Sequence, residues 1–251
     1  MRSSNVAIRN LQRTAQSEMY DPANAATYKG VAKKSLLLIG ITIAAAITSA
    51  ALLFTYPAIA LTLLIISIPA TLIAMLVMIF APQTVKVTGV VYLVAEGIMV
   101  GAISAVVGAA YGGVVLAALL STFGVFGVMM TLYATGVIKV GQKFKSFMIT
   151  ALFAMVVVNL LLFVVSLIFP GVNALFYADG QATLFSIGIS VVMVLFASFF
   201  ILVDLSNIDQ LVQGGFDKKY EWNAAFGLTV TLLWLYLEFL KLFLKIASRR
   251  K

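Results

Sequence analysis

The sequence predicts an all-α integral membrane protein, built as a bundle of seven transmembrane helices. Of its 251 residues, 63% are hydrophobic and 10% are charged, whereas roughly a quarter of the residues in a soluble domain are charged. The mean hydropathy is +1.10. No charged side chain occurs in residues 35–85, 97–138, 146–178 or 180–203, and apolar stretches of about 20 residues are typical of membrane spans. A water-soluble fold is therefore excluded.

The first segment, residues 1–34, is polar and basic and has no long apolar run. It lacks the apolar region behind a short basic start that defines a signal peptide, so we expect a basic cytoplasmic tail. The tail is either mostly flexible or includes a short amphipathic helix around Val6, Ile8 and Leu11. A second, very short basic segment, residues 248–251, ends the chain.

Between these segments, residues 35–247 are expected to form the transmembrane domain. It contains seven apolar ranges, at residues 35–55, 57–80, 87–109, 112–135, 146–168, 184–212 and 222–247. Each is long enough to cross a bilayer core about 30 Å thick. Short connections with helix breakers, such as Tyr56-Pro57 and Gly112-Gly113, predict that the first six ranges form three tight antiparallel hairpins.

One of these ranges carries a stripe of small residues. Gly97 and Gly101 form a GxxxG pattern, and Ser104 and Gly108 continue it along the same side. Small residues at this spacing let helix backbones approach closely in lipid. We therefore expect this side to be a helix-packing face.

The Lys and Arg residues predict the orientation of the bundle. With the N-terminus in the cytoplasm, the tail and the inner loops of the first six helices carry twelve basic residues and the outer loops carry none. Because cytoplasmic loops are enriched in Lys and Arg, we expect the N-terminus to lie in the cytoplasm. The basic residues lie at the expected membrane edges, and this explains the net charge of +8 better than a nucleic-acid groove does. No nucleic-acid partner is therefore expected.

The last apolar range is followed by Arg249, Arg250 and Lys251. A complete crossing would leave these charges outside, against the rule, whereas a central or re-entrant helix would keep them inside. We favour seven complete crossings.

Composition also excludes classes of chemistry, because the chain has no histidine and no cysteine. Thiol nucleophiles, thiolate or imidazole metal sites and histidine acid–base catalysis are absent, and no enzymatic activity is expected. A response to pH near neutrality would have to come from carboxylates in an unusual environment.

Glu96, Asp204 and Glu238 are acidic residues that interrupt the apolar ranges. A charged side chain near the centre of a membrane helix costs about 2.5 to 3.5 kcal/mol on insertion scales, so each is a functional candidate. The alternative is an internal salt bridge, which for Glu238 would involve Lys241, three residues on. Counting from the connecting loop places Glu238 some turns deeper than Asp204, unless the last helix starts late.

The segments ILVDLSNI and LYLEFLKLFLKI resemble the last two helices of the Bax inhibitor-1 (transmembrane Bax inhibitor motif) family. VVYLVAEGIMVGAIS and STFGVFGVMMTLYATGVIKVGQKFK also resemble that family, in particular its bacterial branch with a long basic amino-terminal tail. The resemblance covers roughly residues 20–247 and implies seven helices with a central last helix. It further implies a pH-dependent calcium leak in which Asp204 and Glu238 are gate, pH sensor and calcium ligands, with no other cofactor. Lys86 and Lys241 are the basic residues that could pair with them.

Three hypotheses about function follow. The leading one is a channel for the leak of calcium or another cation, in which carboxylates and backbone carbonyls replace the ion's water, with Glu96 and Asn207 as secondary polar lining. The second is a membrane interaction protein that regulates other membrane proteins or a stress response. The third is proton-coupled transport through the same carboxylates. The expected partners are cations and the lipid bilayer, and on the second hypothesis other membrane proteins.

Overall fold

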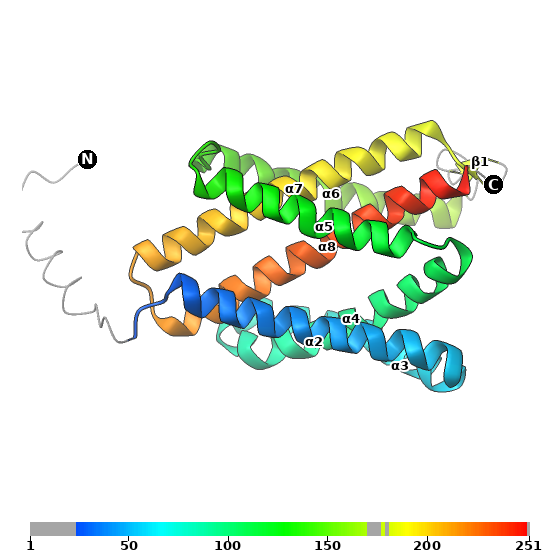
Figure 1. Ribbon diagram of the computed structural model, residues 1–251, viewed down its shortest axis with the longest axis horizontal. Coiled ribbons are helices and arrows are strands. Elements are labelled where there is room, and N and C mark those ends of the chain that lie inside the picture. The colour runs from blue at the N-terminus through cyan, green and yellow to red at the C-terminus, as the bar shows by residue number, and fades with distance from the viewer. Residues whose placement is uncertain (1–23, 170–176, 179–180, 250–251) are drawn as a thin grey trace, which may run out of the picture.

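The computed structural model describes residues 24–169, 177–178 and 181–249, and it is dominated by seven long helices (Figure 1). The helices are α2 (Tyr28–Thr55), α3 (Pro57–Phe80), α4 (Val85–Ala110), α5 (Val114–Ala134), α6 (Gln142–Ile168), α7 (Leu184–Gln213) and α8 (Glu221–Ser248). All seven are long and apolar enough to cross a membrane. Two short 3-10 turns, η1 (Pro82–Thr84) and η3 (Lys218–Tyr220), precede α4 and α8, and β1 (Tyr177–Ala178) pairs with β2 (Gln181–Ala182) between α6 and α7. The predicted all-α seven-helix fold is confirmed.

The first helix begins earlier than predicted, at Tyr28 rather than at residue 35. Thr27 caps it, because its side chain accepts a hydrogen bond from the Gly30 amide at 2.9 Å. The last part of the expected tail is therefore helical. The amphipathic helix considered around Val6, Ile8 and Leu11 lies outside the described residues.

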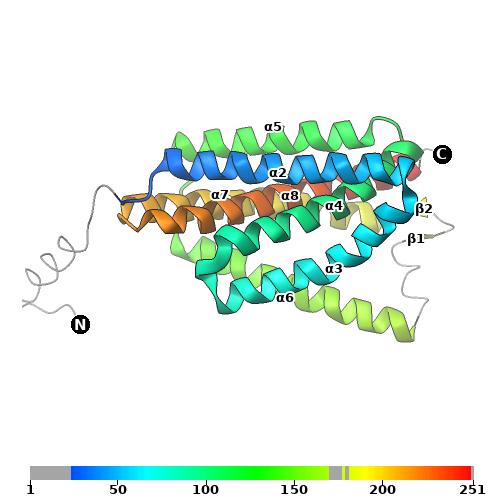
Figure 2. The ribbon, with the colours of Figure 1, turned by 90° about the horizontal axis from the view of Figure 1, so that it is seen from below.

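Successive helices run in opposite directions, so α2, α4, α6 and α8 all begin at one end of the bundle (Figures 1 and 2). We call this the basic end, because the described lysines from Lys29 to Lys34, from Lys139 to Lys145, and Lys86, Lys218 and Lys219 lie there. The last helix ends at the opposite end from the start of α2 (Figure 1). This course agrees with seven complete crossings rather than with a re-entrant last helix.

The expected three tight hairpins are wrong as a description of the packing. The most extensive contacts of α2 are with α4, and α6 contacts the bundle mainly through α7. The GxxxG pattern explains the α2–α4 pairing. A Cβ on Gly101 would lie 2.1 Å from the Ala46 carbonyl oxygen, and one on Gly97 would lie 2.6 Å from that of Thr42. Only the absence of a side chain lets these two backbones approach so closely.

Helix α8 occupies the centre of the bundle, in contact with α2, α4, α5 and α7. Its side chains form much of the hydrophobic core, including the fully buried Leu235 and the nearly buried Tyr236 and Leu240. Helix α6 is at the other extreme, since it lies on the outside and diverges from the bundle toward the far end (Figure 2). The central last helix is therefore confirmed.

Candidate functional site

Asp204 lies on α7 among buried apolar neighbours and points toward α8. Ile201, Leu202 and Val203, which precede it, are each no more than 2% exposed. Its Oδ1 atom is 3.8 Å from the position that a Cβ on Gly227 would take, and Thr231 lies beside the same carboxylate. Its Oδ2 atom is buried and has no hydrogen-bond partner among the described residues. The carboxylate therefore faces the α7–α8 interface, where no described residue forms an ion pair with it and no described donor bonds to its Oδ2 atom.

Glu238 lies in a different environment, on the central helix α8. It is 2% exposed, and its Oε1 atom accepts hydrogen bonds from Trp234 Nε1 at 3.0 Å and from Lys241 Nζ at 2.7 Å. The Lys241 side chain is half exposed and its partner is buried. The internal salt bridge considered from the sequence is therefore present.

The structure does not bring Asp204 and Glu238 together as a pair. Asp204 faces α8 near Gly227, and Glu238 is eleven residues further along that helix, about 16 Å at 1.5 Å per residue. The two carboxylates are separated because α8 starts at Glu221, directly after η3. Because this helix does not start late, the counting argument holds and Glu238 lies deeper.

The other predicted site residues are dispersed. Glu96 is half-buried on α4, and none of the described residues forms a hydrogen bond with it. Asn207 accepts a hydrogen bond from Lys145 Nζ at 2.8 Å. Lys86 is exposed at the start of α4 and forms no ion pair with a described carboxylate. These residues do not line a common polar passage with Asp204.

Two ionic features were not identified from the sequence. Lys145, at the start of α6, is only 5% exposed, and the nearby Asp209 carboxylate, which attracts it, accepts a hydrogen bond from the Tyr133 hydroxyl at 2.5 Å. The other feature is Glu221, which is fully buried. The signal for both is a charged residue directly before a predicted apolar range, Lys145 before residues 146–168 and Glu221 before residues 222–247.

Glu221 ties the start of α8 to the start of α2. It forms an ion pair with Lys34 and accepts hydrogen bonds from the backbone amide and the side chain of Thr27, at 2.8 and 3.2 Å. Gly30 leaves room for it, since a Cβ there would lie 2.1 Å from the Glu221 carboxylate. The connecting backbone adds a bridge between Ala25 and Asp217. These contacts fix the basic end of the bundle.

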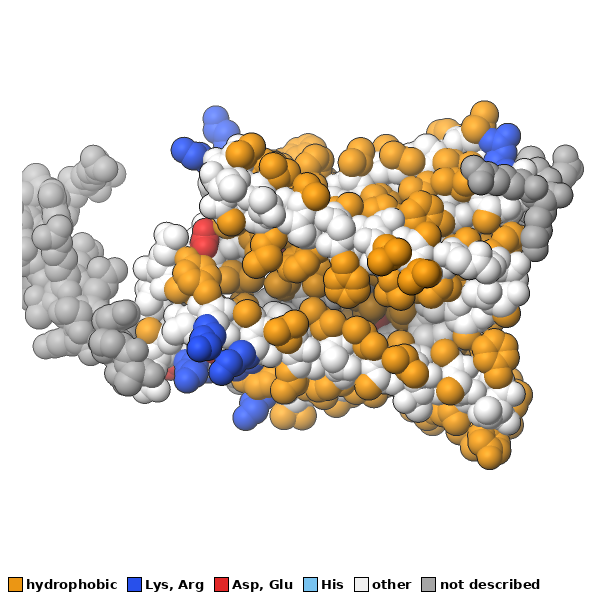
Figure 3. All heavy atoms as spheres, viewed as in Figure 1, with side chains coloured by type: hydrophobic (Ala, Val, Ile, Leu, Met, Phe, Trp, Pro, Cys, Tyr) orange, Lys and Arg blue, Asp and Glu red, His pale blue; other side chains and the backbone are white. Residues whose placement is uncertain are grey.

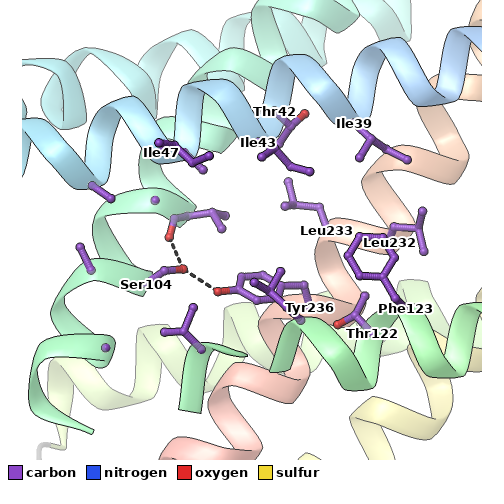
Figure 4. Close-up of a pocket in the computed structure, with 18 of the residues that line it drawn as sticks. Ile39, Thr42, Ile43, Ile47, Ser104, Thr122, Phe123, Leu232, Leu233 and Tyr236 are labelled. Atoms are coloured by element: carbon purple, nitrogen blue, oxygen red, sulfur yellow. Dashed lines mark hydrogen bonds between the residues drawn. The ribbon is translucent and has the colours of Figure 1, made fainter. Parts of the chain in front are cut away.

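A cavity of about 730 Å³ opens between α2, α4, α5 and α8. Figure 4 shows Ile43, Ile47, Phe123 and Leu233 around it, with a hydrogen bond of 2.7 Å between Ser104 Oγ and the Tyr236 hydroxyl. No charged side chain lines it. In this conformation the cavity suits an apolar group and is not an ion pathway.

Calcium in proteins takes six to eight oxygen ligands. Within the described part of the chain, no group of three or more acidic, histidine or cysteine side chains could hold a metal ion. Asp204 and Glu238 are separate, so they do not fit a resident calcium.

The model of a family described as Bax inhibitor 1 like matches residues 4–248, nearly the whole chain. A search of curated proteins found no match.

Proposed function

The chain belongs to the Bax inhibitor 1 like family, and on this premise we propose that it is a pH-sensitive leak channel for calcium or a similar cation, not an enzyme. Its place would be a bacterial inner membrane, with the N-terminus in the cytoplasm. The observation that supports this proposal best is the Asp204 carboxylate at the α7–α8 interface, whose Oδ2 atom is buried and has no hydrogen-bond partner among the described residues. Such a residue is costly in lipid and marks ion or proton pathways.

The proposed gate is the interface between α7 and α8 at Asp204. A neutral Asp204 is compatible with this closely packed interface, because an uncharged acid needs no counterion. An ionised Asp204 requires water or a cation beside it, since a buried unpaired charge is strongly unfavourable. Proton exchange at this residue would therefore be coupled to hydration of the interface, and calcium would enter as the counterion of the ionised state.

Glu238 has a different role in this proposal. Its carboxylate is already satisfied by Trp234 and Lys241, so it holds α8 together and is not the second half of the pH sensor. The resemblance assigns Asp204 and Glu238 to one gate, whereas this proposal gives them different roles.

The test is calcium flux into liposomes that contain the purified protein, measured from pH 5 to 8. We expect the wild type to show a pH-dependent flux and Asp204→Asn to be nearly independent of pH, because the amide is close in shape and does not titrate in this range. Asp217→Asn is the matched control, since Asp217 is exposed in the connecting loop, and it should keep the wild-type profile. Glu238→Gln should keep the midpoint of the pH profile.

Other outcomes identify the alternatives. Unchanged flux in Asp204→Asn together with a lower unfolding temperature would contradict the channel proposal and favour an interaction protein. Calcium movement against its gradient, driven by an imposed proton gradient, would instead identify a proton-coupled transporter.

A further inference from the structure

At the basic end, a second hollow lies between the starts of α4 and α8. It has a volume of about 390 Å³ and is lined by Lys86, Lys218, Lys219, Trp222 and Asn223, with Lys34 and Gln83 at its side. The Asn223 side chain donates a hydrogen bond to the Pro82 carbonyl at 3.2 Å, which joins the α3–α4 turn to the start of α8. The hollow is therefore built from three separate segments of the chain.

Within the described residues, the positive charge in this hollow is only partly neutralised. Lys34 is paired with Glu221, and Lys219 has only a long contact of 3.9 Å with the exposed Asp217. Lys86 and Lys218 form no ion pair with any carboxylate in the described part of the chain. Four lysines thus face two carboxylates, and the remaining positive charge is available to an anion.

Backbone groups add to this preference for an anion. Helices α4 and α8 both begin here, directly after the 3-10 turns η1 and η3, and none of the described side chains caps α4 or α8 itself. Asp217 caps η3 instead, because its side chain accepts a hydrogen bond from the Lys219 amide at 2.8 Å. The first N–H groups of a helix carry partial positive charge and attract phosphate, so the first turns of α4 and α8 add to the attraction of the lysine ammonium groups.

The position of the hollow indicates the source of the anion. It lies where two membrane-spanning helices begin, and Trp222 lines it, with Lys34 Nζ 5.4 Å from the centre of its ring. Tryptophan and lysine are typical of the headgroup level of a membrane. Directly beyond Lys86, Val87 and Val91 are exposed on α4 and offer an apolar surface for acyl chains. Lysines gather at the bundle ends while apolar side chains cover the middle (Figure 3).

From these observations we propose that the hollow binds the phosphate of an anionic phospholipid headgroup, from the leaflet at the basic end. Lys86, Lys218 and Lys219 would contact the phosphate oxygens, and Asn223 and Trp222 would contact the rest of the headgroup. A lipid bound here would bridge α4 and α8 and so stabilise the end of the central helix. The proposal does not depend on the cation leak.

The test uses the full chain in detergent, titrated with dihexanoyl phosphatidylglycerol, dihexanoyl phosphatidylcholine or inorganic phosphate while its unfolding temperature is followed. A ligand that binds the folded state raises this temperature in a concentration-dependent way. We expect phosphatidylglycerol to stabilise the protein well beyond phosphatidylcholine or phosphate. The combined variant Lys86→Gln, Lys218→Gln, Lys219→Gln should weaken its apparent affinity by at least about tenfold, since each lysine near a membrane surface contributes about 1 kcal/mol.

The matched control is Lys139→Gln with Lys143→Gln, two exposed lysines at the same end but outside the hollow. It should keep the affinity within about twofold. Equal losses in both variants would show diffuse surface charge and overturn the site. Equal stabilisation by inorganic phosphate would overturn the lipid as the source, and equal effects of the two lipids would overturn anion recognition. Lys218→Gln alone repeats the test if the combined variant unfolds.

Discussion

Asp204 and Gly227 face each other across the interface of the last two helices, with Oδ1 of the aspartate 3.8 Å from the position that a Cβ on the glycine would occupy. The carboxylate thus lies where α8 has a glycine, with Thr231 beside it. Ion pairing elsewhere on α8 involves Glu221 and Glu238. Among the described residues, Asp204 has no ion-pair partner and its buried Oδ2 atom has no hydrogen-bond partner.

Two Gly→Ala substitutions should differ in the sign of their effect on stability. At Gly227 the added methyl meets an ordinary contact distance, and alanine is favoured over glycine in a helix by about 0.8 to 1 kcal/mol, so stability should stay equal or rise. At Gly101 the methyl would lie 2.1 Å from a backbone oxygen of α2, which cannot move without displacing that helix. Overpacking of this kind costs about 1 to 3 kcal/mol. Unfolding in detergent measures both, and a stabilising Gly101→Ala would contradict the close α2–α4 contact.

Removal of the Glu221 carboxylate should strongly weaken the basic end of the bundle. Glu221→Ala leaves Lys34 and the Thr27 amide without their buried partner, and loss of one member of a buried ion pair costs about 3 to 5 kcal/mol. Asp217→Asn, four residues earlier, serves as the control. Its pair with Lys219 is exposed and 3.9 Å long, so less than about 1 kcal/mol is expected. Similar losses in the two variants would show that Glu221 does not act as a tether.

A double-mutant cycle at Glu238 and Lys241 should reveal coupling. Lys241→Met leaves the buried carboxylate with Trp234 as its remaining donor, and an under-satisfied buried polar group costs about 1 to 3 kcal/mol. Glu238→Gln still accepts the Trp234 hydrogen bond and releases Lys241 to solvent, so its cost should be smaller. The double variant should be more stable than Lys241→Met alone. Purely additive losses would mean that the ion pair does not contribute.

Reporter fusions should place the two ends of the described bundle on opposite sides of the membrane. A fusion near Lys143 should report the cytoplasm, and fusions near residue 180 and after Lys251 should report the outside. The reason is the clustering of basic residues at the end where α2 begins, together with the course of α8 from that end to the opposite end of the bundle (Figure 1). A cytoplasmic reporter after Lys251 would contradict seven complete crossings.

Much of the fold could be predicted because membrane helices are encoded locally. The predicted range 57–80 coincides with α3, and the other six overlap their helices, although α2 starts seven residues before its range. The Thr27 cap at that start is a local signal. Thr27 also binds Glu221, which is 194 residues away in the chain, and no local pattern contains this second partner.

The candidate site was predicted only in part. The apolar surroundings of Asp204 made it a functional candidate, and the spacing of Glu238 and Lys241 indicated their salt bridge. The anionic-lipid hollow could not be found in this way, because Lys86 and Lys218 are far apart in the chain and meet only where α4 and α8 begin side by side.

The sequence by itself determined that the chain has seven helices long and apolar enough to cross a membrane, since the bilayer selects apolar stretches of the right length whatever their neighbours are. It also determined which residues would be costly in lipid. The tertiary structure decided how those residues are compensated. In lipid, helices associate through close backbone packing and interhelical polar contacts, and these depend on register. Gly101 selects α2 as the partner of α4, and the start of α8 at Glu221 sets Asp204 against Gly227 and leaves Glu238 with its own lysine.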